Sequence, residues 1–169
     1  MNYRKATIQD LPSICTLIED AKTLMRKQGI YQWNEYYPHK NDFEEDIKNN
    51  NLYLAEEDEL LAVYSINEEC DEDYNQFKWS TDHYCVLHRL CVSPNRQGKG
   101  IGKTVLSQIE KQAKDMGYDA IRLDVFSLNP YARRLYEKNG FVKRGHAHWH
   151  MGEFYLMEKI LNVLIRASS

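Results

Sequence analysis

The 169-residue sequence lacks any run of apolar residues long enough to span a lipid bilayer. Its first segment, Met1 to Asp10, is mixed and polar, without the apolar stretch of a secretory signal peptide. The four cysteines, Cys15, Cys70, Cys85 and Cys91, form no CxxC pair. They suggest neither a zinc site nor a disulfide framework, so we expect reduced thiols and a cytoplasmic location.

The sequence also lacks a strong charge of either sign, internal repeats and low-complexity linkers. A net charge of −3 argues against a protein whose main partner is nucleic acid, because phosphate backbones need a concentrated basic surface. Hydrophobic residues make up 43% and charged residues 28%, which is typical of an ordinary globular chain. The length suits one domain, so we expect a single domain over residues 1–169.

Apolar residues recur at helical spacing in three long stretches. These are Leu11–Leu24, Lys103–Met116 and Pro130–Lys138, with Gly29, Gly117 and Gly140 as the stop signals after them. A shorter helix is expected over residues 41–49, and residues 68–83 are expected to form a loop. Strands are expected over residues 1–8, 52–55, 60–66, 84–92, 120–126, 141–143 and 154–160. This order predicts an α/β (α+β) fold, a mixed sheet with helices on both faces.

A glycine-rich segment separates the strand at 84–92 from the next helix. It reads Gln97-Gly98-Lys99-Gly100-Ile101-Gly102-Lys103-Thr104. Glycines let the backbone approach a ligand, and a helix N-terminus favours an anion, so this segment predicts a phosphate or pyrophosphate site. A nucleotide P-loop fits poorly because Gln97 replaces its first glycine, and a dinucleotide fingerprint fails at Lys103. A surface turn without a ligand is the remaining alternative.

Two motifs connect the sequence with a known family. Gln97-x-x-Gly100-x-Gly102 matches the Q/R-x-x-G-x-G/A signature of the GNAT family of N-acetyltransferases. Downstream, the segment 129–141 carries that family's N-x-x-A-x-x-x-Y-x-x-x-G-F pattern. The chain therefore resembles the GNAT family, most clearly over residues 84–141, and two motifs at the right separation are more specific than either alone.

The resemblance implies a single GNAT-type domain with a mixed, mostly antiparallel sheet of about six to seven strands. Residues 1–83 would be the acceptor side, residues 84–141 the acetyl-CoA-binding core, and residues 141–160 the C-terminal strands. It further implies direct transfer of an acetyl group from acetyl-CoA to a primary amine, without a metal. Because transfer is direct in this family, Cys85 and Cys91 are expected to be packing residues.

The same resemblance assigns the residues that would bind acetyl-CoA. Loop residues would hold the pyrophosphate, three basic side chains would add charge near it, the central strand would pair with the pantetheine arm, and Asn129 and Tyr136 would contact that arm and its sulfur. The expected contacts are Leu90, Cys91, Val92, Arg96, Gln97, Gly98, Lys99, Gly100, Ile101, Gly102, Lys103, Asn129 and Tyr136. Asn129 has a second interpretation as a helix cap, Tyr136 as a core aromatic, and the three basic side chains as a solvated face.

The catalytic proton transfers lead to further expectations. A tyrosine hydroxyl beside the thioester sulfur can protonate the departing thiolate, so Tyr136 is the expected general acid. The backbone N–H near Leu90 would polarise the acetyl carbonyl. For the base, His88 is one candidate on the central strand and Glu68 or Glu69 another, with a buried structural histidine as the alternative for His88. Asp124 is expected only to support the sheet.

The sequence gives weaker indications for the residues that would bind the acceptor amine. The aromatic segment 31–37 includes Tyr31 and Trp33, which are candidates for contacting the acceptor, although packing is their commoner role. His146, His148 and His150 are expected to lie exposed in a loop, and no metal is expected. We expect a small-molecule amine as partner and a monomer or homodimer, with no nucleic acid and no membrane. Acetylation of a protein N-terminus or lysine is the alternative function, followed by a non-catalytic CoA-binding module.

Overall fold

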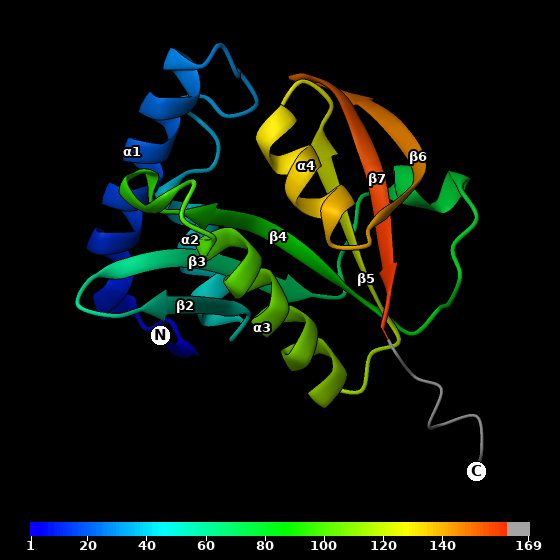
Figure 1. Ribbon diagram of the computed structural model, residues 1–169, viewed down its shortest axis with the longest axis horizontal. Coiled ribbons are helices and arrows are strands. Elements are labelled where there is room, and N and C mark those ends of the chain that lie inside the picture. The colour runs from blue at the N-terminus through cyan, green and yellow to red at the C-terminus, as the bar shows by residue number, and fades with distance from the viewer. Residues whose placement is uncertain (162–169) are drawn as a thin grey trace. The chain divides into compact units, whose positions relative to one another are not determined.

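The computed structural model describes residues 1–161 and contains four α-helices and seven strands among them (Figure 1). The helices are α1 (Leu11–Lys27), α2 (Lys40–Lys48), α3 (Ile101–Asp115) and α4 (Pro130–Lys138). Three short 3₁₀ turns are η1 (Ile8–Asp10), η2 (Glu72–Gln76) and η3 (Pro94–Arg96). The strands are β1 (Asn2–Lys5), β2 (Leu52–Glu56), β3 (Leu60–Asn67), β4 (Tyr84–Val92), β5 (Ala120–Phe126), β6 (Val142–Trp149) and β7 (Gly152–Ile160).

The strands belong to one sheet in the order β1-β2-β3-β4-β5-β7-β6. The pairs β1–β2, β2–β3, β5–β7 and β6–β7 are antiparallel. β4 and β5 are parallel, as expected for strands joined by a crossover helix, here α3. The predicted fold, a mixed and mostly antiparallel sheet of about six to seven strands, is confirmed with seven strands.

The chain divides into two compact units, and the division passes through both β4 and α3. The first unit contains Met1–Ile66 and His88–Val105, and the second contains Asn67–Leu87 and the chain from Leu106 onward. Both units therefore contain residues from distant parts of the sequence. Each unit is described separately below.

The first unit is built around an aliphatic core. The helical spacing of Ile14, Leu17, Ile18 and Ala21 places these residues on one face of α1, where they are buried. They pack in one cluster with side chains from α2, β2, β3 and β4, namely Phe43, Leu52, Leu54, Val63 and Cys91. Each fully buried side chain of this size stabilises the fold by about 1.5–3 kcal/mol, so this cluster fixes both helices on the strands.

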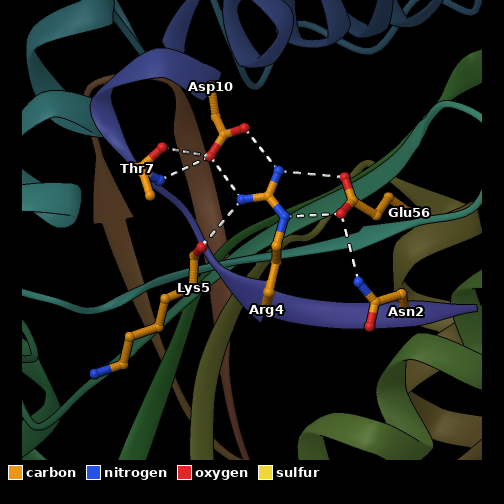
Figure 2. Close-up of polar contacts among 6 residues, drawn as sticks. All are labelled: Asn2, Arg4, Lys5, Thr7, Asp10 and Glu56. Carbon is orange, nitrogen blue, oxygen red and sulfur yellow. Dashed lines mark hydrogen bonds and ion pairs between the residues drawn. The ribbon is translucent and has the colours of Figure 1, made fainter.

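A charged cluster stabilises the edge of the first unit (Figure 2). The guanidinium of Arg4 on β1 donates two hydrogen bonds of 2.8 Å to the carboxylate of Asp10 in η1. On its other side it donates to Glu56 of β2, at 2.7 Å from Nε. Asp10 also accepts a 2.7 Å bond from the backbone N–H of Thr7. The hydrogen bonds from Arg4 hold the pKa of Asp10 down at about 2, so Asp10 is ionised at neutral pH.

The second unit is rich in aromatic contacts. The segment 67–83 packs on the hairpin of β6 and β7, with Tyr74, Ala147 and Leu156 buried at its centre. The ring of Phe77 lies over Gly145, where an added Cβ would approach that ring to 2.4 Å. Residues 68–83 were expected to form a loop, but they include η2, bury Tyr74 and partly bury Phe77 and Trp79. A pattern of isolated aromatics among polar residues has no clear period, so the sequence did not predict its packing.

The last hairpin corrects a second expectation. β6 was expected to end at Lys143, but it continues to Trp149, so His146 and His148 lie on a strand rather than in a loop. They are exposed and alternate with the buried residues Gly145 and Ala147. Small residues at the inward positions hide the period-two pattern, which is why the strand was missed. Within residues 1–161, no helix is both long and apolar enough to cross a membrane.

Candidate active site

The glycine loop of the first unit has the backbone geometry of a turn that only glycine adopts easily. Gly98 has φ +81° and Gly100 has φ +78°. In this left-handed region a side chain is strained. A Cβ built on either glycine would have no atom within 4 Å, so the backbone there borders open space. The side-chain amide of Gln97 donates a 3.3 Å hydrogen bond to the Val92 carbonyl and connects the loop with the end of β4.

Helix α3 begins directly after this loop. The N–H of Thr104 bonds to the carbonyl of Gly100 at 3.1 Å, so residues 101–103 precede the first helical hydrogen bond. Such N–H groups at a helix start attract anions. Lys99 and Lys103 are exposed beside them. Arg96 instead forms a 3.1 Å ion pair with Glu59, so part of its charge is already balanced. This arrangement fits a pyrophosphate group.

Strand β4 contains an unusual residue in its middle. Arg89 has φ +53°, which is uncommon for a residue with a side chain. Strict alternation along a strand would place Tyr84, Val86, His88, Leu90 and Val92 on one face, but the left-handed Arg89 interrupts that alternation. β4 pairs with β5 over Tyr84–Val86, before this position. Leu90, Cys91 and Val92 follow it on the strand, and Cys91 packs into the core of the first unit.

The cysteines of β4 are unsuitable nucleophiles. Burial raises the pKa of Cys85 and of Cys91 to about 12. Both therefore remain neutral thiols near pH 7, and the thiolate is the reactive form. This supports the expectation that they pack rather than carry an acetyl group.

Helix α4 of the second unit holds the other predicted contacts. The Asn129 side chain accepts a 3.1 Å bond from the N–H of Ala132, so its interpretation as a helix cap is confirmed. Tyr136, two turns later, is buried and packs edge-on against Phe141 with ring centroids 5.5 Å apart. No hydrogen bond of its hydroxyl to another group is found within residues 1–161. Burial first, and the charge of Asp124 second, raise the pKa of Tyr136, so it stays protonated at neutral pH.

Asp124 on β5 has a larger role than the sequence suggested. Its carboxylate accepts a 2.7 Å hydrogen bond from the hydroxyl of Tyr74 and lies within electrostatic reach of Tyr136. One carboxylate thus acts on two buried tyrosines, one from η2 and one from α4. In the sequence, only the position of Asp124 five residues before Asn129 hinted at this role. The alternation of residues along a strand does not show which distant side chains Asp124 contacts.

The candidate bases lie in different units. His88 is half-buried on β4 in the first unit. Glu68 is exposed after β3 in the second unit, and its charge acts on Tyr84 and Cys85 at the start of β4. Its neighbour Glu69 is also exposed.

The acceptor candidates also differ from one another. Trp33 is half-buried against the core of the first unit, which matches the packing interpretation. Tyr31 is 61% exposed, and Tyr36 is 76% exposed. Among residues 1–161, no group of three or more His, Cys, Asp or Glu side chains is placed to hold a metal ion.

Comparisons with known proteins agree with the two motifs. The sequence profile of the acetyltransferase (GNAT) family matches residues 13–141, which is more than half of the chain. The N-acetyltransferase YesJ of Bacillus subtilis is 25% identical over 145 residues, covering 83% of this chain and 81% of YesJ. A GNAT-family acetyltransferase structure from Streptococcus agalactiae has a TM-score of 0.84 at 26% identity, covering 94% of both chains.

A third protein adds a ligand-bound example of the fold. The PaiA N-acetyltransferase of Thermoplasma acidophilum, solved in complex with coenzyme A, has a TM-score of 0.69 at 23% identity, covering 94% of this chain and 98% of PaiA. Fold, loop and relatives together define an acyl-group transferase. The chain belongs to the acetyltransferase (GNAT) family and is an acetyl-CoA-dependent N-acetyltransferase.

Proposed function

We propose that this enzyme acetylates the primary amine of a small molecule. The observation that carries the proposal is the aromatic segment 31–37 of the first unit. Its backbone is fixed by local hydrogen bonds, while the rings of Tyr31 and Tyr36 are exposed. Exposed aromatic faces on a fixed loop suit a small cationic amine, because an ammonium group binds favourably over an aromatic ring.

For the donor, we propose that the glycine loop binds the pyrophosphate of acetyl-CoA, which supplies the acetyl group. Gly98 and Gly100 keep side chains away from it, and the N–H groups of residues 101–103 and the charges of Lys99 and Lys103 favour its negative charge. The backbone of Leu90–Val92 is assigned to the pantetheine arm. The side-chain amide of Asn129 is assigned to the same arm in addition to its capping role.

For the proton transfers, we propose that Tyr136 donates its hydroxyl proton to the thiolate of CoA as the C–S bond of the thioester breaks. Support comes from its raised pKa, which keeps the proton in place until it is needed. The ammonium form of the acceptor must lose a proton before it reacts. To His88 and Glu68 we add Asp124 as a candidate for that base, because it is a carboxylate within electrostatic reach of Tyr136.

The test compares acceptors in two steps. Thermal unfolding is first followed with acetyl-CoA, ATP or NAD, and acetyl-CoA at about a hundred times its dissociation constant should stabilise the fold by roughly 2.7 kcal/mol. Release of the CoA thiol is then measured with a panel of small amines and with peptides that have a free N-terminus or lysine. Turnover with small amines alone supports the proposal. Turnover with peptides alone contradicts it, and tight binding without any turnover indicates a CoA-binding module.

A further inference from the structure

The aromatic segment 31–38 is held in place by an internal amide. The side-chain oxygen of Asn34 accepts hydrogen bonds of 2.8 Å from the backbone N–H groups of both Tyr36 and Tyr37. The N–H of Asn34 in turn bonds to the Tyr37 carbonyl at 2.9 Å. These contacts define the shape of the loop but do not connect it with the rest of the unit.

Two cations outside the loop make that connection. Lys22 of α1 is only 2% exposed, and its ammonium donates a 2.8 Å bond to the carbonyl of Pro38. Its second contact, Glu19 at 3.3 Å, is an exposed residue one turn away. A lysine is almost never buried without such partners. The buried ammonium therefore needs the Pro38 carbonyl, and this requirement holds the end of the loop against α1.

Arg89 holds the loop from the side of β4. Its Nη1 donates to the hydroxyl of Tyr37 at 3.1 Å, and its Nε donates to Asp46 of α2 at 3.0 Å. Asp46 is 5% exposed. Burial raises the pKa of Asp46, and the guanidinium opposes that rise, so the carboxylate depends on Arg89 for its charge. One guanidinium therefore joins three parts of the unit: β4, α2 and the aromatic segment.

The backbone of Arg89 links these side-chain contacts to the part of β4 assigned to acetyl-CoA. Its left-handed conformation is strained, and such strain persists only where the surroundings fix it. The next residue along the strand is Leu90, whose backbone begins the segment assigned to pantetheine. Any shift of Arg89 therefore shifts the loop relative to that strand.

A buried ion pair is weak evidence for stability, since desolvation cancels much of the attraction. What such a pair does well is to fix one geometry. We propose that Arg89 and Lys22 are positioning residues that hold the aromatic segment 31–38 as a preformed wall for the acceptor amine, and that they set the KM for the acceptor rather than affinity for acetyl-CoA. This inference rests on the proposed function.

The main test replaces the charged pair by amides, Arg89→Gln with Asp46→Asn, so that no buried charge is left alone. The matched control is Arg4→Gln with Asp10→Asn, which removes the other arginine–aspartate pair of this unit (Figure 2). Loss of about 1.4 kcal/mol of loop positioning should raise the amine KM about tenfold in the first variant, with the acetyl-CoA Kd unchanged. The control should leave both constants unchanged.

A milder variant guards against failure of the first to fold. Tyr37→Phe removes only the hydroxyl that accepts from Arg89, and it should raise the amine KM about two- to fivefold. Because this contact is exposed and water can replace it, the unfolding temperature should change little. An unchanged KM in both Tyr37→Phe and the amide pair overturns the inference. So does an equal rise of KM in the Arg4 control, or a parallel loss of acetyl-CoA affinity.

A readout independent of activity separates this inference from the proposed function. Hydrogen exchange of the N–H groups of Tyr36 and Tyr37 should be faster in the amide pair than in the wild type and the control. If the wild type acetylates no amine, the proposed function fails, and exchange still decides whether Arg89 anchors the loop. Unchanged exchange removes the anchoring itself.

Discussion

The two compact units present the groups proposed for function in opposite ways. In the first, the Gly98–Gly100 loop offers bare backbone beside open space, and elsewhere in the unit charged side chains pair, as Arg4 does with Asp10. In the second, the groups of interest are buried side chains, Asn129 and Tyr136, in a setting of aromatic rings. A backbone site can change its ligand affinity without changing the core, whereas a buried side chain serves packing and chemistry together.

This difference predicts how separable binding and stability are in each unit. Substitutions in the glycine loop should affect acetyl-CoA binding by more than their cost to folding. In the second unit, only a substitution that removes a single atom, such as a hydroxyl oxygen, should change activity without also changing stability. The predictions below test that contrast from the largest expected effect to the smallest.

The largest effect is expected for Gly100→Val. A β-branched side chain at φ +78° is strained, and its Cβ would occupy the space proposed for the pyrophosphate. Loss of two hydrogen bonds to a charged ligand, at about 1.5–3 kcal/mol each, should weaken acetyl-CoA binding roughly 10²–10⁴-fold. Isothermal calorimetry or the thermal shift with acetyl-CoA measures this directly.

The matched control is Gly29→Val in the same unit. Gly29 has φ +75° and likewise no atom within 4 Å of an added Cβ. Both variants should lose about 1–2 kcal/mol of stability from backbone strain, but only the change at Gly100 should weaken acetyl-CoA binding. Equal binding losses in the two would mean that strain, not the ligand site, explains the result.

The second effect is expected for Tyr136→Phe. Removing a general acid should lower kcat by roughly 10²–10⁴-fold, and a phenol with a raised pKa is a weaker acid, which favours the lower end. Stability should change little, because no partner for this hydroxyl is found in residues 1–161. The acetyl-CoA Kd should stay within about twofold, since the ring remains.

Tyr74→Phe provides the contrast within the second unit. Its hydroxyl donates to Asp124 at 2.7 Å, so its removal should cost about 1 kcal/mol of unfolding free energy. Denaturant unfolding of both variants, with steady-state kinetics, separates the two roles. A large stability loss in Tyr136→Phe with an unchanged kcat would make it a core residue.

The features that the sequence predicted well depend on local rules. The Gln97-x-x-Gly100-x-Gly102 spacing gave the loop, because positive φ and a helix start both leave a mark on residue type. Asn129 as a cap is another such case. The seven strands followed from periodicity, and their boundaries were wrong by up to six residues, as at the end of β6.

What the sequence did not predict depends on contacts between distant positions. Nothing local to Arg89 indicates a left-handed conformation, because the partners that hold it, Asp46 and Tyr37, lie more than forty residues earlier. Asp124 shows the same limit, since its link with Tyr74 spans fifty positions. Polar pairs of this kind are specified by the tertiary structure and leave no periodic pattern in the sequence.

High pH should weaken the fold through the buried Tyr74 of the second unit. Burial raises the pKa of Tyr74 well above its ordinary value, and the charge of Asp124 adds to the rise. The folded state then keeps a proton that the unfolded chain loses near pH 10, so this stability is present below pH 10 and falls as the pH rises further. The expected slope is at most about 1.4 kcal/mol per pH unit for each such tyrosine.

Unfolding by urea between pH 9 and 11 measures that slope. Tyr74→Phe should have a shallower slope than the wild type, and Tyr36→Phe, which removes an exposed hydroxyl, should not. An equal slope in all three proteins would mean that Tyr74 ionises at the same pH in the folded and unfolded states.

Low pH should instead act on the first unit, and this is the smallest expected effect. The pKa of Asp10 is lowered to about 2 by hydrogen bonds from Arg4, against about 3.9 in an unfolded chain. The stability that this pair adds is therefore complete above about pH 4 and is lost as the pH falls towards 2. Because Arg4 is 37% exposed, solvent screening limits the contribution to about 1 kcal/mol.

Asp10→Asn should remove this part of the acid dependence. Its unfolding free energy should be lower than that of the wild type at pH 6, and the difference should shrink by pH 2, where the wild-type carboxylate also becomes neutral. Added salt should reduce the difference at pH 6, because exposed ion pairs are screened. A difference that is constant from pH 6 to pH 2 would mean that the Asp10 side chain acts through its hydrogen bond to Thr7, independently of charge, and the contrast between a charge-paired first unit and an aromatic second unit would lose its acid half.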